Sequence, residues 1–356
     1  MQAFLKTLRW TVGLLFIFSG LIKANDPLGL SYKMQEFFEV WGLAFLDDYS
    51  LALSLFMNTL EIVAGVALLI KFPYKQTLWL LLGLIVFFTF LTGYALFSGK
   101  IKTCGCFGDC IPLTPKVSFI KDVVLLFAIL ILLFNHKKVK SNLSKSLGIF
   151  LLILSTGLVS YGQYYTLQHL PFIDCLPYKR GNDIKEQMKT PEGAIPDSVS
   201  IQMSFLKEGK TVQFDINQFP SDFDSTYVFQ DRKEVLIQKG NGLEAKIVDF
   251  SLFTINNLDT TASLLNTKEP YVLLFSGTID NSRPWKDLIA KIKQKHALVY
   301  LVTADKANAA QLQLDIPILI GDMTMIKTAA RVWPSVMIMN GSTIMEKQSY
   351  VDYLKK

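Results

Sequence analysis

The sequence predicts a protein of two parts, a bundle of membrane-spanning α-helices followed by a mixed α/β domain. The first observation is composition, because 51% of the 356 residues are hydrophobic and they are concentrated before about Tyr165. The second is that five apolar stretches in this half approach the roughly 20 residues that a helix needs to cross a bilayer. The third is that short apolar strands alternate with helical patterns in the later half, as in an α/β sheet.

The five candidate spans follow one another through the first half. They are Leu8–Ile22, Leu51–Ile70, Leu78–Phe97, Val117–Phe134 and Leu147–Tyr164. Lys121 and Asp122 interrupt only the start of the fourth span. Lys6 and Arg9 before the first apolar core are also typical of a secretory signal, but no small-x-small cleavage pattern follows before Asn25. We therefore expect the first helix to be retained.

The placement of basic residues predicts the orientation. Eight lysine and arginine residues lie on the amino-terminal side of the spans and six lie in the short loops of the other side. This bias favours a cytoplasmic amino terminus in a bacterial inner membrane. Five spans then place the loop between spans three and four, Cys175 and the carboxyl-terminal domain in the periplasm.

The net charge of +6 agrees with lysines that flank membrane spans. No basic tract interleaved with aromatic residues appears, so we expect contacts with membrane lipid and no nucleic-acid partner.

Glu61 is a carboxyl group near the midpoint of the second span. A charge inside a membrane is costly, so such a residue is protonated or paired, and it is a functional candidate by default. Two interpretations stay open. Glu61 handles a proton, or it is a structural partner of Asn58, Arg9 or Lys23.

Three segments of the first half carry a family resemblance. "LRWTVGLLFIFSGLIKAND" has an arginine near its start, spaced glycines and a lysine near its end; "LEIVAGVALLI" contains Glu61 and Gly65; "CGCFGD" follows the third span. They resemble the first two helices and the cysteine loop of DoxX-type membrane proteins of the MauE branch, over roughly the first 135 residues. The resemblance implies a four-helix core with a fifth helix appended and a link to thiol–disulfide chemistry. MauE itself is associated with the maturation of a disulfide-rich periplasmic enzyme.

Strand patterns characterise the later half. Val199–Leu206 and Thr211–Phe214 alternate on either side of Gly209 and Lys210, which predicts a hairpin. A second strand-rich piece runs through Tyr227–Phe229 and Glu234–Gln238 and ends near Gly240. The other predicted elements are strands at Tyr271–Phe275 and His296–Val302, and an amphipathic helix at Trp285–Lys295.

Two further segments resemble thioredoxin-like domains of the TlpA and peroxiredoxin kind. "DFSLF" resembles the entry to such domains, and "RVWPSVMIMNGSTIMEK" resembles their closing hairpin. Asn340 and Gly341 form the predicted hairpin turn. The resemblance implies that Pro334 takes the place of the cis-proline that precedes this hairpin.

The sequence departs from a working thioredoxin where the reactive dithiol belongs. That dithiol is a C-x-x-C motif that opens a helix after the first central strand, where the helix terminus lowers the thiol pKa. Here the place reads "SGTIDNSRPW", with Ser276 and Ser282 but no cysteine. We expect a degenerate domain that binds a partner or covers the membrane part and does not run dithiol exchange by itself.

Four cysteines leave three interpretations open. They are Cys104, Cys106, Cys110 and Cys175. A zinc site is a poor fit to a C-x-C-x3-C pattern with one distant cysteine, and we expect no metal. As permanent staples the cysteines allow three pairings, of which a bridge from the loop to Cys175 would tie the fifth span to the third and fourth. In the redox interpretation Cys104 and Cys106 exchange electrons, because a C-x-C disulfide closes a strained and labile ring. Cys110 and Cys175 then form a resolving pair or a shuttle.

Two hypotheses about function follow. In the first, the chain is a thiol–disulfide oxidoreductase of the cell envelope that exchanges electrons with a periplasmic thiol protein. A membrane quinone is then a candidate onward acceptor, with Glu61 handling a proton. In the second, the chain is a non-catalytic subunit of an envelope complex, whose thioredoxin-like domain docks a partner and whose cysteines are structural. The expected division is a membrane domain at 1–135, a fifth helix and linker at 136–175, a strand-rich segment at 176–245 and the thioredoxin-like domain at 246–356.

Overall fold

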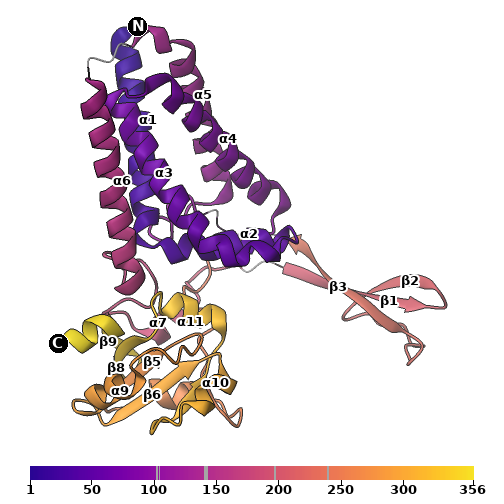
Figure 1. Ribbon diagram of the computed structural model, residues 1–356. Coiled ribbons are helices and arrows are strands. Elements are labelled where there is room, and N and C mark those ends of the chain that lie inside the picture. The colour runs from indigo at the N-terminus through magenta and orange to yellow at the C-terminus, as the bar shows by residue number, and fades with distance from the viewer. Residues whose placement is uncertain (102, 104, 140–142, 196–197, 239) are drawn as a thin grey trace. The chain divides into compact units, whose positions relative to one another are not determined.

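The computed structural model describes residues 1–101, 103, 105–139, 143–195, 198–238 and 240–356. The chain divides into two compact units, of which the first joins Met1–Gly181 with Ser251–Lys356 and the second is Asn182–Phe250. Figure 1 labels the helices and strands of both units. Cys104 lies outside the described residues, so its predicted pairing with Cys106 stays a prediction.

Five long helices form the membrane part of the first unit. They are α1 (Gln2–Asn25), α3 (Ser50–Ile70), α4 (Tyr74–Ser98), α5 (Pro115–Phe134) and α6 (Lys145–Gln168). Each is long and apolar enough to cross a membrane, and each contains one of the predicted spans. The shorter helical elements of this part are α2 (Pro27–Val40), η1 (Ala44–Tyr49) and η2 (His136–Lys138). The predicted membrane bundle is therefore confirmed.

Local signals delimit the cysteine loop between α4 and α5. Gly99 ends α4 with a φ of 66°, a left-handed conformation that costs glycine little. Thr114 begins α5, because its side chain accepts a hydrogen bond from the backbone N–H of Val117 and Pro115 occupies the first turn. The loop is thus held between two fixed helix ends.

Helices α1 and α3 approach closely through glycines. A Cβ added to Gly65 would lie 2.8 Å from the carbonyl oxygen of Gly13, and one added to Gly20 would lie 2.5 Å from the side chain of Ile62. Small residues at such contacts let helix backbones approach in a membrane, where lipid supplies no hydrophobic force to bring them together. This contact sets the register of α1 against α3, and hence which polar side chains of the two helices meet.

The turn from α1 to α2 is fixed by a capped helix start. Asp26 accepts a hydrogen bond from the backbone N–H of Gly29 at 3.0 Å, and Pro27 occupies the first turn of α2. At its other end α2 buries Phe37, and the following Trp41 packs its ring against Tyr94 of α4. The ends of α1 and α4 are therefore connected through α2.

A six-stranded sheet forms the carboxyl-terminal part of the first unit. Its strands, in spatial order, are β4 (Phe253–Thr254), β7 (Ile318–Ile320), β6 (Leu298–Thr303), β5 (Tyr271–Phe275), β8 (Ser335–Asn340) and β9 (Thr343–Ser349). Strand β5 runs parallel to β6 and antiparallel to β8, and all its residues are buried. This central position accounts for its uninterrupted apolar sequence. The helices of this part are α8 (Thr261–Leu265), α9 (Trp285–Lys293), α10 (Lys306–Gln311), α11 (Met323–Ala329) and α12 (Tyr350–Lys355).

The predicted closing features of this sheet are confirmed. The Trp333–Pro334 peptide bond is cis, and β8 and β9 form an antiparallel hairpin around Asn340 and Gly341. The predicted helix at Trp285 is α9, which buries Leu288 and Ile292 in the same core as strands β5 and β6. The α/β fold class of this part is therefore the one that the sequence predicts.

The second unit contains α7 (Ile184–Met188) and a three-stranded antiparallel sheet in the order β2–β1–β3. Its strands are β1 (Ser198–Lys207), β2 (Lys210–Asp215) and β3 (Val228–Gln238). The predicted hairpin is confirmed, with Lys207 paired to Lys210. Strand β3 covers the strand-rich piece that the sequence predicts through Tyr227–Phe229 and Glu234–Gln238. The intervening Gln230, Asp231 and Arg232 are all exposed, so their polarity does not interrupt the strand.

Candidate functional site

The cysteine loop turns back toward the helices at Cys106. Gly105 and Gly108 both have left-handed φ angles, 66° and 55°, and the N–H of Gly108 donates to the carbonyl of Gly105 at 3.0 Å. This turn brings the Cys106 carbonyl to 3.0 Å from the hydroxyl of Ser19 on α1. Cys106 is partly buried and carries a free thiol. The loop glycines thus hold one predicted site cysteine against α1.

Glu61 is paired with a lysine inside the helix bundle. The Lys23 ammonium forms an ion pair with the Glu61 carboxylate, and both side chains are only 4% exposed. The hydroxyl of Ser19 also lies 3.1 Å from Glu61, so it stands between this carboxylate and the Cys106 backbone. Because a hydroxyl has one proton, Ser19 donates to only one of these two acceptors at a time.

The structure decides among the partners that the sequence left open for Glu61. Arg9 donates instead to the backbone carbonyls of Leu68 and Leu69, and the Asn58 amide donates to Gln163 of α6 at 3.1 Å. Lys23 is therefore the charged partner.

A second buried carboxylate lies beside the first. Asp122 of α5 is fully buried, pairs with Lys121 at 2.5 Å and accepts a hydrogen bond from Thr92 at 3.0 Å. Glu61, Asp122 and Ser19 line one cavity of about 20 Å³. A neighbouring cavity of about 40 Å³ is lined by Lys23 and Cys106 among apolar side chains. We call Ser19, Lys23, Glu61, Lys121 and Asp122 the polar cluster.

Sequence reasoning did not single out Ser19, Asp122 or Thr92 as site residues. Asp122 carries the same signal as Glu61, because a carboxylate next to an apolar span is costly unless it is paired. Ser19 and Thr92 give no such signal, since hydroxyl residues are common in membrane helices.

Burial raises the pKa of the Cys106 thiol. Lys121 and Lys23 act in the opposite direction, while Asp122 adds to the increase. The thiolate is the nucleophile in disulfide exchange, so a raised pKa keeps the Cys106 thiol protonated and slow at neutral pH. Exchange at this residue therefore requires a group that accepts its proton.

We expect the alkylation of Cys106 to shift to higher pH. The protein to use is the Cys104→Ser variant with the Cys110–Cys175 bond left oxidised, so that Cys106 is the single free thiol. Because the raised pKa delays thiolate formation, the iodoacetamide rate should rise at a higher pH than that of a cysteine peptide. If the rate of Cys106 alkylation rises at the same pH as that of the cysteine peptide, or at a lower pH, the pKa of Cys106 is not raised.

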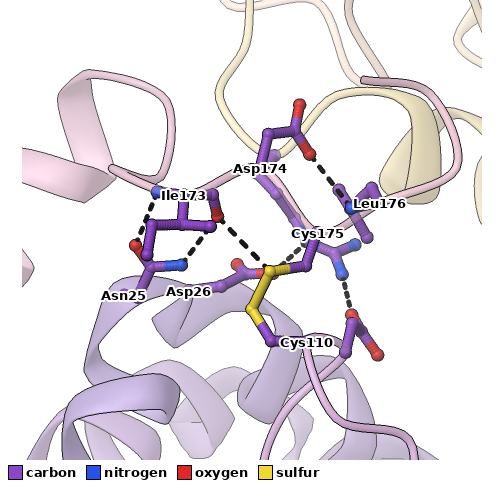
Figure 2. The surroundings of a disulfide bond; sticks show 9 residues. Asn25, Asp26, Cys110, Ile173, Asp174, Cys175 and Leu176 are labelled. Carbon is purple, nitrogen blue, oxygen red and sulfur yellow. Dashed lines mark hydrogen bonds and ion pairs between the residues drawn. A yellow bond between two sulfur atoms is a disulfide. The ribbon is translucent and has the colours of Figure 1, made fainter. Parts of the chain in front are cut away.

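The other two predicted cysteines form a disulfide. Cys110 in the α4–α5 loop is bonded to Cys175, which follows α6, and their Cα atoms are 4.8 Å apart. Figure 2 shows this bond beside the end of α1, where the Asn25 amide exchanges two hydrogen bonds with the backbone of Ile173, at 2.9 and 3.0 Å. This is the loop-to-Cys175 bridge that the sequence raised as one possibility. It joins the ends of three membrane helices.

The bonded state of these cysteines bears on the zinc interpretation. A metal thiolate is a reduced sulfur, so Cys110 and Cys175 cannot both be zinc ligands while they are bonded to each other. Among the residues that the structure describes, no three histidine, cysteine, aspartate or glutamate side chains are grouped to hold a metal ion.

The place of a thioredoxin dithiol is occupied by serine and glycine. Ser276 follows β5 directly, is buried, and donates its hydroxyl to the carbonyl of Thr278 at 2.7 Å. Gly277 lies against Trp333, next to the cis-proline. The described backbone thus keeps the thioredoxin-like arrangement without the sulfur.

Comparison with known proteins finds matches to separate parts of the chain. Residues 1–135 match the family described as methylamine utilisation protein MauE, and residues 202–239 match a domain of unknown function. A 155-residue region is 28% identical to Protein TlpB of Flavobacterium psychrophilum and covers 41% of each chain. No solved structure matches the chain.

The MauE match covers four of the five long helices of the first unit, and the match to the domain of unknown function lies in the second unit. The first unit contains five apolar helices and a six-stranded sheet with a cis-proline before β8. Residues 1–135 therefore form a membrane domain of the MauE type, and a thioredoxin-like part follows it at the carboxyl end of the chain.

Proposed function

We propose that this chain is a membrane-embedded thiol–disulfide exchange protein of the cell envelope, with Cys106 as the exchanging thiol. The observation that carries the proposal is the free Cys106 thiol held at the polar cluster. A buried Lys23–Glu61 ion pair and the buried Asp122 carboxylate are costly inside an apolar bundle, and such groups are typical of sites where charge or protons move. The proposed orientation places the cysteine loop and the thioredoxin-like part in the periplasm, where disulfides persist.

The proposed reaction is a two-step exchange. The Cys106 thiolate attacks one sulfur of a partner protein's disulfide, so that a Cys106–partner bond forms, the partner's bond breaks, and the leaving thiolate takes a proton. Cys104 then displaces the partner, which leaves as a dithiol, and a Cys104–Cys106 disulfide remains. Two electrons have passed from the loop to the partner. When the same steps run backwards, the Cys104–Cys106 disulfide oxidises the dithiol of the partner protein. The reduction potentials of the two cysteine pairs determine the direction.

The polar cluster supplies the proton acceptor for this reaction. Ser19 touches both the Glu61 carboxylate and the Cys106 backbone, and Lys23 lines the cavity in which Cys106 lies. In the proposal the Cys106 proton passes to this cluster when the thiolate forms. Glu61→Gln should then slow the thiol turnover of Cys106, and an unchanged turnover would remove the proton-handling role.

A membrane quinone stays a candidate onward acceptor of these electrons. The described cavities next to Cys106 and Glu61 measure about 40 and 20 Å³, enough for a few waters. The exchange written above needs no electron step on a quinone.

The test is to trap the partner on Cys106. In a Cys104→Ser variant the second step cannot occur, so a mixed disulfide between Cys106 and its partner should accumulate when cells are quenched with acid and alkylated. It should disappear when the sample is reduced. The same adduct should be absent from the Cys104→Ser/Cys106→Ser variant, which keeps the Cys110–Cys175 bond.

Two results would overturn the proposal. If Cys104→Ser yields no adduct while Cys106 stays reduced and unchanged under oxidising and reducing growth, Cys106 is not an exchanging thiol. If the adduct forms in Cys106→Ser and not in Cys104→Ser, the roles of the two residues are reversed.

The Cys110–Cys175 bond favours a second candidate function. It connects the loop to the segment after α6, as a structural staple would. In this alternative the chain is a non-catalytic envelope subunit, whose thioredoxin-like part docks a partner. Thiol trapping separates the candidates, because staples stay oxidised under all growth conditions whereas an exchanging protein shows a mixture of states.

A further inference from the structure

Each cysteine of the Cys110–Cys175 bond is preceded by an aspartate that is ion-paired to the thioredoxin-like part. Asp109 pairs with the guanidinium of Arg331 at 2.5 Å, and Asp174 pairs with the ammonium of Lys347 at 2.8 Å. Figure 2 shows Asp174 next to Cys175, with its carboxylate directed to the backbone N–H of Leu176. The two chain segments that meet at the disulfide are therefore also held by two cations from one domain.

Arg331 connects three pieces of chain. Besides Asp109 it pairs with Asp26 at 2.7 Å, the residue that caps α2 at the end of α1. Its side chain is only 6% exposed, and it lies three positions before the cis-proline Pro334. Burial alone would lower the pKa of Arg331, but Asp26 and Asp109 outweigh it and raise the pKa. The guanidinium is thus held charged between the cysteine loop and the helix ends.

Lys347 holds the second cysteine segment in the same way. It lies on β9, paired in register with Met337 of the neighbouring β8, and its side chain is 3% exposed. Its ammonium contacts the Asp174 carboxylate and also the Tyr178 carbonyl, at 3.2 Å, so it contacts the chain on both sides of Cys175. Burial lowers the pKa of Lys347, and Asp174 partly restores it.

These contacts do not depend on the sulfur–sulfur bond. Each pair joins a nearly buried cation to a partly exposed aspartate, and neither pair involves the sulfur atoms, so the two aspartates stay with their cations after the bond is reduced. Asn25 adds two hydrogen bonds to Ile173, close to Cys175. The two thiols are consequently kept near each other in the reduced protein.

We propose that Arg331 and Lys347 are positioning residues that keep Cys110 and Cys175 within reach of each other, so that their disulfide opens and closes reversibly. The thioredoxin-like part, which lacks its own dithiol, then supplies geometry to a dithiol of the membrane part. A biological role for this positioning rests on the proposed exchange function. The positioning itself affects the equilibrium between the open and closed Cys110–Cys175 disulfide.

The proposal can be tested by thiol–disulfide exchange between the Cys110–Cys175 pair and glutathione. Oxidised glutathione reacts with one thiol of the reduced pair to give a mixed disulfide and one reduced glutathione. The other cysteine then displaces the second glutathione and forms the Cys110–Cys175 bond. The second step is intramolecular, so its equilibrium rises with the effective concentration of one thiol at the other.

The experiment measures this equilibrium in the full-length protein in detergent. A Cys104→Ser/Cys106→Ser background leaves only the Cys110–Cys175 pair. The protein is equilibrated in glutathione buffers of graded ratio, and the reduced fraction is read from a gel shift after maleimide tagging. Arg331→Gln and Lys347→Met should each lower the equilibrium constant for ring closure by about tenfold, and should slow re-formation after reduction.

Matched variants separate positioning from general destabilisation. Lys293→Gln removes an ion pair with Asp315 that is exposed and lies wholly within the thioredoxin-like part, so it should leave the equilibrium unchanged. Where a single variant does not fold, the exchanged pair Lys347→Asp/Asp174→Lys keeps both charges and should restore much of the parental equilibrium. Equilibria within about twofold of the parent for Arg331→Gln and Lys347→Met would overturn the inference. The absence of Cys106 adducts would overturn the proposed function and leave this measurement unaffected.

Discussion

Lys23→Met is expected to destabilise the membrane part strongly. The substitution leaves the Glu61 carboxylate without its cation inside the bundle, where both side chains are 4% exposed. Removing one partner of a buried pair costs about 3–5 kcal/mol, because the remaining charge is uncompensated. Thermal unfolding in detergent, followed by circular dichroism, should show a large drop in melting temperature relative to the parent.

A double variant separates charge from packing. Lys23→Met/Glu61→Gln removes both charges, so it should recover most of the stability that the single substitution loses. Lys189→Met serves as the exposed control, because the side chains of the Lys189–Glu186 pair are 68% and 61% exposed and such surface pairs contribute little to stability. Losses that simply add in the double variant would show that the two residues do not act as a pair.

Gly65→Leu is expected to force α1 and α3 apart. Even a Cβ at this position would lie 2.8 Å from the Gly13 carbonyl oxygen and 2.8 Å from the Ile17 side chain, so the backbones must separate. Overpacking of this kind costs about 1–3 kcal/mol, and more where backbone must move. The same shift displaces Ser19 and Lys23 relative to Glu61, so Cys106 should also become easier to alkylate.

The control for this prediction is a glycine in open space. A Cβ added to Gly83 of α4 meets no heavy atom within 4 Å. Gly83→Ala should therefore change stability by less than about 1 kcal/mol, and in the stabilising direction, because alanine favours helix over glycine. If Gly65→Leu is as well tolerated as Gly83→Ala, the close approach of α1 and α3 does not limit stability.

The sequence predicts the described architecture to a large extent. Each of the five spans contains a run of apolar residues long enough to cross a bilayer, and this signal is local and strong. The central strand β5 and the turn at Asn340 and Gly341 are equally local signals. Strand β3 shows how a polar centre is accommodated, since Gln230, Asp231 and Arg232 within it are exposed.

The candidate site is predicted only in its parts. Cys106, Cys110, Cys175 and Glu61 are recognisable by residue type, since thiols and membrane carboxylates are rare and chemically distinctive. Ser19 and Arg331 are not, because a hydroxyl in a membrane helix and an arginine before a proline are ordinary features. Their roles depend on which residues they contact.

By itself the sequence therefore determined the number of spans, the α/β class of the carboxyl-terminal part and the absence of a dithiol where a thioredoxin carries one. Those properties depend on neighbours a few positions apart, through hydrophobic periodicity and turn chemistry. Only the tertiary structure decided that Cys110 bonds to Cys175, that Lys23 neutralises Glu61 and that Arg331 contacts Asp26, 305 positions away. These choices rest on the packing of distant segments, because buried charges and thiols must find partners that the fold, and not the local chain, brings within a few ångströms.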